Sequence, residues 1–273
     1  RKMKLLTGLS TIAAGAMLLS ACSGEGDGEG AEGESDVTVD APVDAGAEGE
    51  GAEGEGEGGE SEGVAERSGD PADDNVAYLH QLGMMRGHLE AFSELYRSGD
   101  REMGLMHAKH PESELYAALA PAFAARQKAG FADELTALVA AATAGGDIDE
   151  PYNDLINAMS AAEPDASPRE TILAVSALVK SAAEEFELGV DDDGSITNLH
   201  EYQDAYGFVS ASRVMLSQID TNDINTTDAI SHAHEQLDVA LIAFPGLVAE
   251  STEGMPSTLY GAAARIEIAA LGL

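Results

Sequence analysis

The chain changes character near residue 74, and this change limits what it can fold into. Residues 23–73 consist mainly of Gly, Glu, Ala, Asp and Ser. Such a segment buries too little apolar surface to offset the entropy lost on ordering, so it predicts a disordered acidic linker. From Asp74 onward apolar residues recur at spacings of three and four, which is the period of an amphipathic helix. We therefore expect one folded, all-α region, residues 74–273.

Helix start and stop signals divide this region into about eight helices, in one elongated or two packed bundles. The first is expected to run from a cap at Asp74 or Asn75 to Gly99. Residues 167–170 (SPRE) form a capping box with proline at the first helical position, and residues 198–201 are read as a second cap of the same kind. Thr227 or Asp228 is expected to start a helix that ends at Phe244. A subdivision of the domain would fall near residues 145–167.

The first 22 residues predict a secretory signal. Arg1, Lys2 and Lys4 precede a short apolar run that ends in small residues and in the only cysteine of the chain. The run is too short for a comfortable membrane span. Leu19-Ser20-Ala21-Cys22 resembles the lipobox of bacterial lipoproteins, which implies cleavage before Cys22 and lipid on that residue. An ordinary signal peptide is the alternative.

The lipobox resemblance implies a bacterial cell-envelope protein, anchored to the membrane by lipid and facing the periplasm or the cell surface. Ser23 stands where many lipoproteins retained at the inner membrane carry aspartate, so the resemblance favours the outer membrane. The net charge of −36 excludes nucleic acid as a partner, because phosphates would be repelled.

Histidine and methionine gather early in the helical region. His80, Met84 and His88 lie four apart on one helical face, and Met103, Met106, His107, His110 and Glu114 follow after a short connection. Imidazole with thioether suits copper, whereas imidazole with carboxylate suits zinc or iron. We predict a transition-metal site for iron, copper or zinc formed by His80, Met84, His88, His107, His110 and Glu114. The alternative is that the methionines fill the core and the histidines only form hydrogen bonds.

Two weaker patterns also contain metal-binding residue types. His232, His234 and Asp238 lie on one predicted helix, but they need a partner helix to complete a site, and a solvated helix face is the simpler reading. Residues 191–196 (DDDGSI) resemble the middle of an EF-hand loop. The first ligand and the final glutamate of that loop are missing, so an Asp-Gly turn explains the same residues.

Enzyme motifs are absent from the sequence. There is no Gly-x-Ser-x-Gly, no His-Glu-x-x-His and no glycine-rich phosphate loop. We therefore expect a binding protein and not an enzyme.

Two stretches, residues 82–90 (LGMMRGHLE) and 194–202 (GSITNLHEY), resemble extracytoplasmic helical domains that accompany bacterial iron uptake. The second is similar to the turn and Glu-Tyr helix start found beside iron permeases. Imelysin-like lipoproteins are also all-α, but their Gly-x-His-x-x-Glu signature is not met, because Gly87 adjoins His88 and residue 91 is alanine. The resemblance implies iron as the ligand and an envelope transporter, or another envelope protein, as the partner. The alternatives are a scaffold lipoprotein that docks a partner without metal and, more distantly, an imelysin-type peptidase.

Overall fold

The computed structural model describes residues 69–111 and 115–273. The signal sequence with Cys22, residues 23–68 of the linker and Glu114 lie outside the described residues. The helices of the described part are α1 (Asn75–Ser98), α2 (Arg101–His110), α3 (Tyr116–Ala125), α4 (Ala132–Thr143), α5 (Asp149–Ala162), α6 (Pro168–Gly189), α7 (Leu199–Ser217), α8 (Ile224–Leu241) and α9 (Pro256–Ala270). The only β-structure there is two isolated bridges, so the all-α prediction is confirmed.

Side-chain caps start two of these helices, α1 and α6, as predicted. The Asp74 carboxylate accepts hydrogen bonds from the backbone N–H groups of the first turn of α1, and Gly99 ends that helix at a φ of 105°. Ser167 and Glu170 form the reciprocal capping box of α6. Asn198, in contrast, makes no side-chain cap at the start of α7, so the second capping box was wrong.

The predicted bounds of α8 were also wrong. The carboxylate of Asp223 accepts from the backbone N–H of Thr226 at 2.8 Å, and α8 therefore begins at Ile224. It ends at Leu241, before Phe244. Residues 191–196 form the expected turn, because the N–H of Gly194 donates to the carbonyl of Asp191 at 2.8 Å and Gly194 has a φ of 84°.

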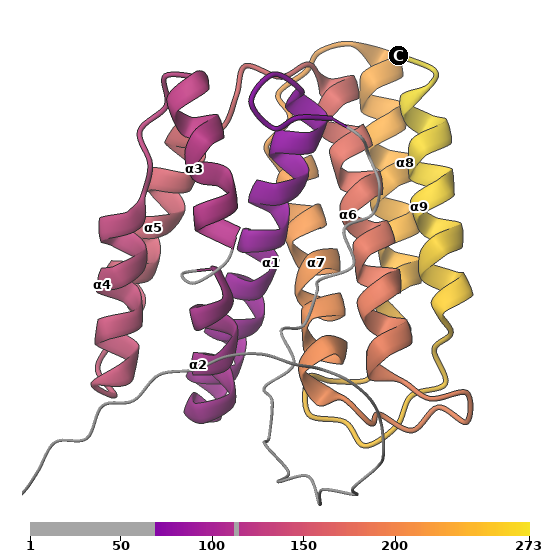
Figure 1. Cartoon of the computed structure of the whole chain (residues 1–273). Helices are drawn as coiled ribbons and strands as arrows, with labels where there is room; N and C mark the ends of the chain where they lie inside the picture. Colours follow the sequence, from indigo (N-terminus) through magenta and orange to yellow (C-terminus); the bar gives the residue numbers. More distant parts are fainter. Residues whose placement is uncertain (1–68, 112–114) are drawn as a thin grey trace, which may run out of the picture. The chain divides into compact units, whose positions relative to one another are not determined.

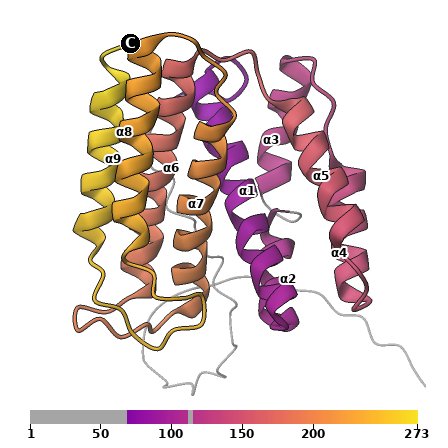
Figure 2. The ribbon, with the colours of Figure 1, turned by 180° about the vertical axis from the view of Figure 1, so that it is seen from behind.

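Helix α1 lies between two groups of helices that belong to one compact unit (Figures 1 and 2). On one side, α6, α7, α8 and α9 pack as a four-helix bundle whose core includes Leu79 and Met84 of α1. On the other side, α2 to α5 enclose a second core with Tyr78, Met85 and Leu89 of α1. Because both faces of α1 pack against other helices, four of its polar residues are buried, namely His80, Arg86, His88 and Ser93. No helix of the described part is long and apolar enough to cross a membrane.

Glycines allow three helices to approach closely at one level of α1. A Cβ built on Gly207 of α7 would lie 2.3 Å from the carbonyl oxygen of Gly87 of α1. A Cβ on Gly104 of α2 would lie 3.1 Å from the backbone of α1 at Phe92. At Gly207 only a residue without a side chain fits, and at Gly104 a side chain would fit only if the neighbouring backbone moved by a few tenths of an ångström. His88, which follows Gly87, and Asp204, one turn before Gly207, are thereby brought within reach of each other.

Candidate metal centre

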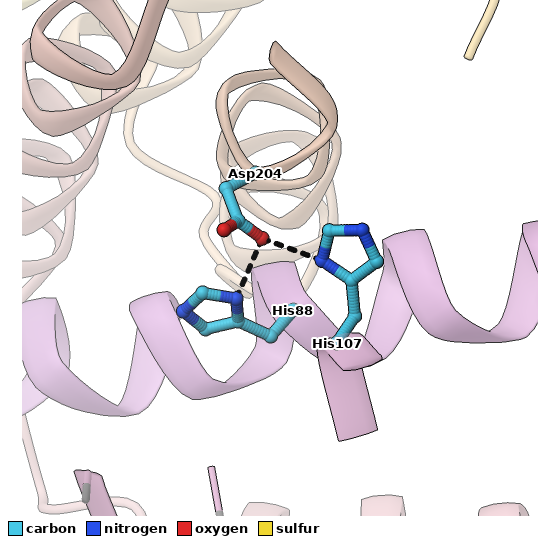
Figure 3. Close-up of side chains that lie close together, drawn as sticks. All are labelled: His88, His107 and Asp204. Carbon is cyan, nitrogen blue, oxygen red and sulfur yellow. Dashed lines mark hydrogen bonds and ion pairs between the residues drawn. The ribbon is translucent and has the colours of Figure 1, made fainter. Parts of the chain in front are cut away.

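A buried cluster of imidazoles and one carboxylate lies where α1, α2 and α7 meet. Helix α1 contributes His88, α2 contributes His107 and His110, and α7 contributes His200 and Asp204. The spacing of three on α2 and of four on α7 places each pair on one helix face. Asp204 is 2% exposed and lies at the centre. Figure 3 shows His88 and His107 both directed at its carboxylate.

The two oxygens of Asp204 face different histidines. Oδ1 lies 2.6 Å from Nδ1 of His88 and 2.8 Å from Nδ1 of His107. Oδ2 lies 3.4 Å from Nδ1 of His200. The rings of His107 and His200 stack with centroids 4.4 Å apart, and the ring of His110 is 5.0 Å from that of His200.

Two sets of three potential ligand atoms follow from this arrangement, and they share Asp204. We call His88, His107 and Asp204 the inner triad, and His110, His200 and Asp204 the outer triad. In each triad the ligand atoms lie within 4.8 Å of one another. A first-row metal ion with imidazole and carboxylate ligands at about 2 Å needs donor atoms with separations of this order.

Burial and charge set the protonation of the cluster. Burial acts to raise the pKa of Asp204, but the charges and hydrogen bonds of His88 and His107 outweigh it, so the pKa lies well below its usual range. Burial lowers the pKa of His200 to about 4, although Asp204 opposes this shift. At neutral pH Asp204 is therefore ionised and His200 is neutral, which are the forms that bind metal.

A hydrogen-bond chain behind His107 determines which of its nitrogens carries a proton. The amide Nε2 of Gln203 donates to the carbonyl oxygen of Leu247 at 2.9 Å. The other end of the amide, Oε1, is an acceptor and lies 2.8 Å from Nε2 of His107. Nε2 of His107 must therefore donate, and in the neutral ring the lone pair is on Nδ1, which faces Asp204.

This tautomer is the one that a metal ligand requires. A lone pair on Nδ1 of His107 facing the ionised Oδ1 of Asp204 at 2.8 Å is repulsive unless a proton or a cation lies between them. Histidines that bind metal commonly donate their second N–H to an oxygen acceptor, and Gln203 supplies such an acceptor here.

The structure brings together His88, His107 and His110 of the residues predicted from sequence. His80 lies elsewhere, with its Nε2 3.0 Å from Oγ of Ser181 on α6. Met84 packs in the apolar core shared with α6 to α9. The sulfur of Met103 lies 2.7 Å from the amide nitrogen of Gln203. Met106 is half exposed at 49%.

The second predicted cluster stays on the surface of α8. Asp238 pairs with Arg213 of α7, and Nδ1 of His232 lies 3.7 Å from Oε2 of Glu235. Burial lowers the pKa of His234. In the part of the chain that the structure describes, His232, His234 and Asp238 do not form a group of converging ligand atoms.

Sequence reasoning missed His200, Gln203 and Asp204. His200 and Asp204 are four apart in a segment that begins with the Asn-Leu-His-Glu-Tyr motif, so their spacing on one helix face was a usable signal. What the sequence did not reveal is that α7 packs against α1 and α2, which lie about a hundred residues earlier in the chain.

Residues 163–267 match the family model of the iron permease-associated 4-helix bundle domain. The match spans α6, α7, α8 and most of α9, and thus includes His200 and Asp204. His88, His107 and His110 precede it. No curated protein and no solved structure matches the chain. For this part of the chain the comparison supports the resemblance to helical domains associated with iron uptake.

Proposed function

We propose that this protein binds a transition-metal ion between α1, α2 and α7 and serves as a binding component of iron uptake. The observation that carries the proposal is the convergence of four histidines, from two separate parts of the chain, on the single buried carboxylate of Asp204. A dication there meets the ionised carboxylate of Asp204, which partly balances its charge, and imidazoles that release any proton on the ligating nitrogen as the ion binds.

The donor set favours a divalent ion of the iron or zinc type. Two imidazoles and one carboxylate, as in the inner triad, suit iron(II), and imidazole with carboxylate also suits zinc. Copper(I) prefers sulfur, and the thioethers of Met84 and Met103 are directed to other contacts. Iron is placed first because residues 163–267 resemble a domain named for its association with iron permeases.

The location in the cell is a further part of the proposal. A lipid on Cys22 would hold the protein at the bacterial envelope, with an iron permease or another envelope transporter as its partner. We assign it no catalytic role. Cys22→Ser should release the protein from the membrane fraction while the helical region stays folded, as measured by fractionation and circular dichroism. Retention of the variant on membranes after a salt wash would contradict the lipid anchor.

Metal binding is tested by thermal unfolding of the full chain with iron(II) under anaerobic conditions, zinc(II) and copper(I), each added separately. Binding to the native state alone stabilises by about 2.7 kcal/mol at a hundredfold excess over Kd. For a region of this size that corresponds to roughly 5–10 °C in Tm. His107→Ala should reduce the rise to about half or less, because affinity at least about tenfold weaker leaves about 1.4 kcal/mol or less at the same metal concentration. His232→Ala, which replaces an exposed histidine on α8, is the matched control. Absence of any shift with all three metals would refute metal binding and favour the scaffold lipoprotein.

A further inference from the structure

The inner and outer triads differ in their access to solvent. The side chains of His88, His107 and Asp204 are 1%, 0% and 2% exposed. In the outer triad, the side chain of His200 is 12% exposed and His110 is of intermediate exposure. An ion arriving from solvent therefore meets the outer triad first.

The two triads share one carboxylate and are too poor in negative charge to be filled together. Their ligand sets contain one carboxylate between them, that of Asp204. The stacked rings of His107 and His200, one from each triad, have centroids only 4.4 Å apart. Two dications held in the two triads would repel each other four times as strongly as two unit charges at the same distance, and in a buried site a single carboxylate does not offset their combined charge.

Asp204 is placed to contact an ion in either position. Its Oδ2 faces His200 of the outer triad, and its Oδ1 faces His88 and His107 of the inner triad. An ion that moves from one triad to the other therefore keeps a carboxylate ligand while it exchanges one pair of imidazoles for another. Protons on the ligating nitrogens are released to water as the metal binds.

We propose that one metal ion uses both triads in sequence, entering at His110, His200 and Asp204 and settling at His88, His107 and Asp204. This inference rests on the proposed function and adds a route to it. The outer triad determines how fast the ion enters and leaves, and the inner triad determines how tightly it is held.

The test uses cobalt(II) as a stable, coloured probe and the full chain. The wild type should bind one equivalent. His200→Phe keeps a ring stacked on His107 but removes the ligand nitrogen. We expect this variant to bind one equivalent with Kd within about threefold of wild type, while loading and release to a chelator both slow by about tenfold or more. His110→Ala, a second outer variant, should behave in the same way.

The inner variant should show the opposite pattern. His107→Ala should load as fast as wild type but bind at least about tenfold more weakly. Circular dichroism and the Tm of each metal-free variant establish that it is folded, and His232→Ala controls for loss of a surface histidine.

Three results would overturn the inference. Two equivalents bound by the wild type would mean that both triads fill together. Equal loss of affinity in His200→Phe and His107→Ala, with unchanged rates, would mean a single joint site. Unchanged rates and unchanged affinity in both outer variants would mean that the outer triad has no part in binding. Each of these leaves the proposed function standing, whereas no binding of cobalt(II), iron(II) or zinc(II) by the wild type would refute the proposed function itself.

Discussion

The close contact of Gly87 with Gly207 predicts that Gly207→Ala lowers both the melting temperature and the metal affinity. A Cβ at position 207 would lie 2.3 Å from the carbonyl oxygen of Gly87, whereas real Cβ atoms come no closer than 3.0 Å, which leaves a shortfall of 0.7 Å. That oxygen is part of the backbone of α1 and cannot rotate away. Helices α1 and α7 must therefore separate or slide at this level.

The separation should reach the candidate metal centre, because His88 follows Gly87 directly and Asp204 lies one turn before Gly207. If the full 0.7 Å were transmitted, the 2.6 Å contact between His88 Nδ1 and Asp204 Oδ1 would lengthen to about 3.3 Å, beyond an ordinary hydrogen bond. Overpacking costs about 1–3 kcal/mol. Alanine in a helix recovers about 1 kcal/mol relative to glycine. The net loss is up to about 2 kcal/mol, or up to roughly 4–8 °C in Tm.

Gly83→Ala is the matched control, because Gly83 lies on α1 one turn before Gly87 and also faces a neighbouring helix. Its Cβ would meet only side-chain ends, Leu178 Cδ2 at 2.8 Å and Met215 Sδ at 3.1 Å, which can move aside. We expect this variant to melt at or above the wild-type temperature and to bind metal normally. Gly207→Ala should bind cobalt(II) at least about tenfold more weakly in calorimetric titration. If it matched Gly83→Ala in both Tm and affinity, the idea that this helix contact positions the ligands would be wrong.

Two further predictions concern a hydrogen-bond partner of His107 and the capping box of α6. Gln203→Leu should fold but bind metal about 10–100-fold more weakly in a competition titration, because His107 loses the acceptor of its Nε2 proton; an unchanged affinity would show that the tautomer is not controlled there. The backbone N–H of Ser167 lowers the pKa of Glu170, so the carboxylate stabilises the fold above its ordinary pKa and this contribution is lost as pH falls through the lower folded value. Unfolding of wild type and Glu170→Gln should therefore differ at neutral pH and converge in acid, and a difference that grew on acidification would refute this assignment.

The helices were largely predictable because their signals are local. Asp74, Gly99 and Ser167 act within one turn of their own helices, so no knowledge of the tertiary fold was needed. The start of α8 was not predictable in this way. Residues 221–223 and 225–228 are all Thr, Asn or Asp, and each of these residue types can cap a helix N-terminus. In the structure Asp223 is the residue that caps α8.

The candidate site was predictable only where its residues are neighbours in sequence. His88, His107 and His110 lie on two helices joined by a short connection, so their approach followed from an antiparallel pair. His80 lies on α1 like His88, but it is eight residues earlier. That is about 12 Å along the helix, which is too far for both to bind one ion. The partner of His80 is Ser181 of α6. Asp204 enters from a distant helix, and its position depends on how α7 packs.

The most direct test of the account is the position of bound metal in a crystal of the protein grown or soaked with iron(II) under anaerobic conditions. Anomalous diffraction at the iron absorption edge locates the ion independently of any assumption about its ligands. We predict a single peak about 2 Å from Asp204 and from the facing nitrogens of His88 and His107. No peak near Asp204, or a peak at His232, His234 and Asp238 instead, would contradict the central claim.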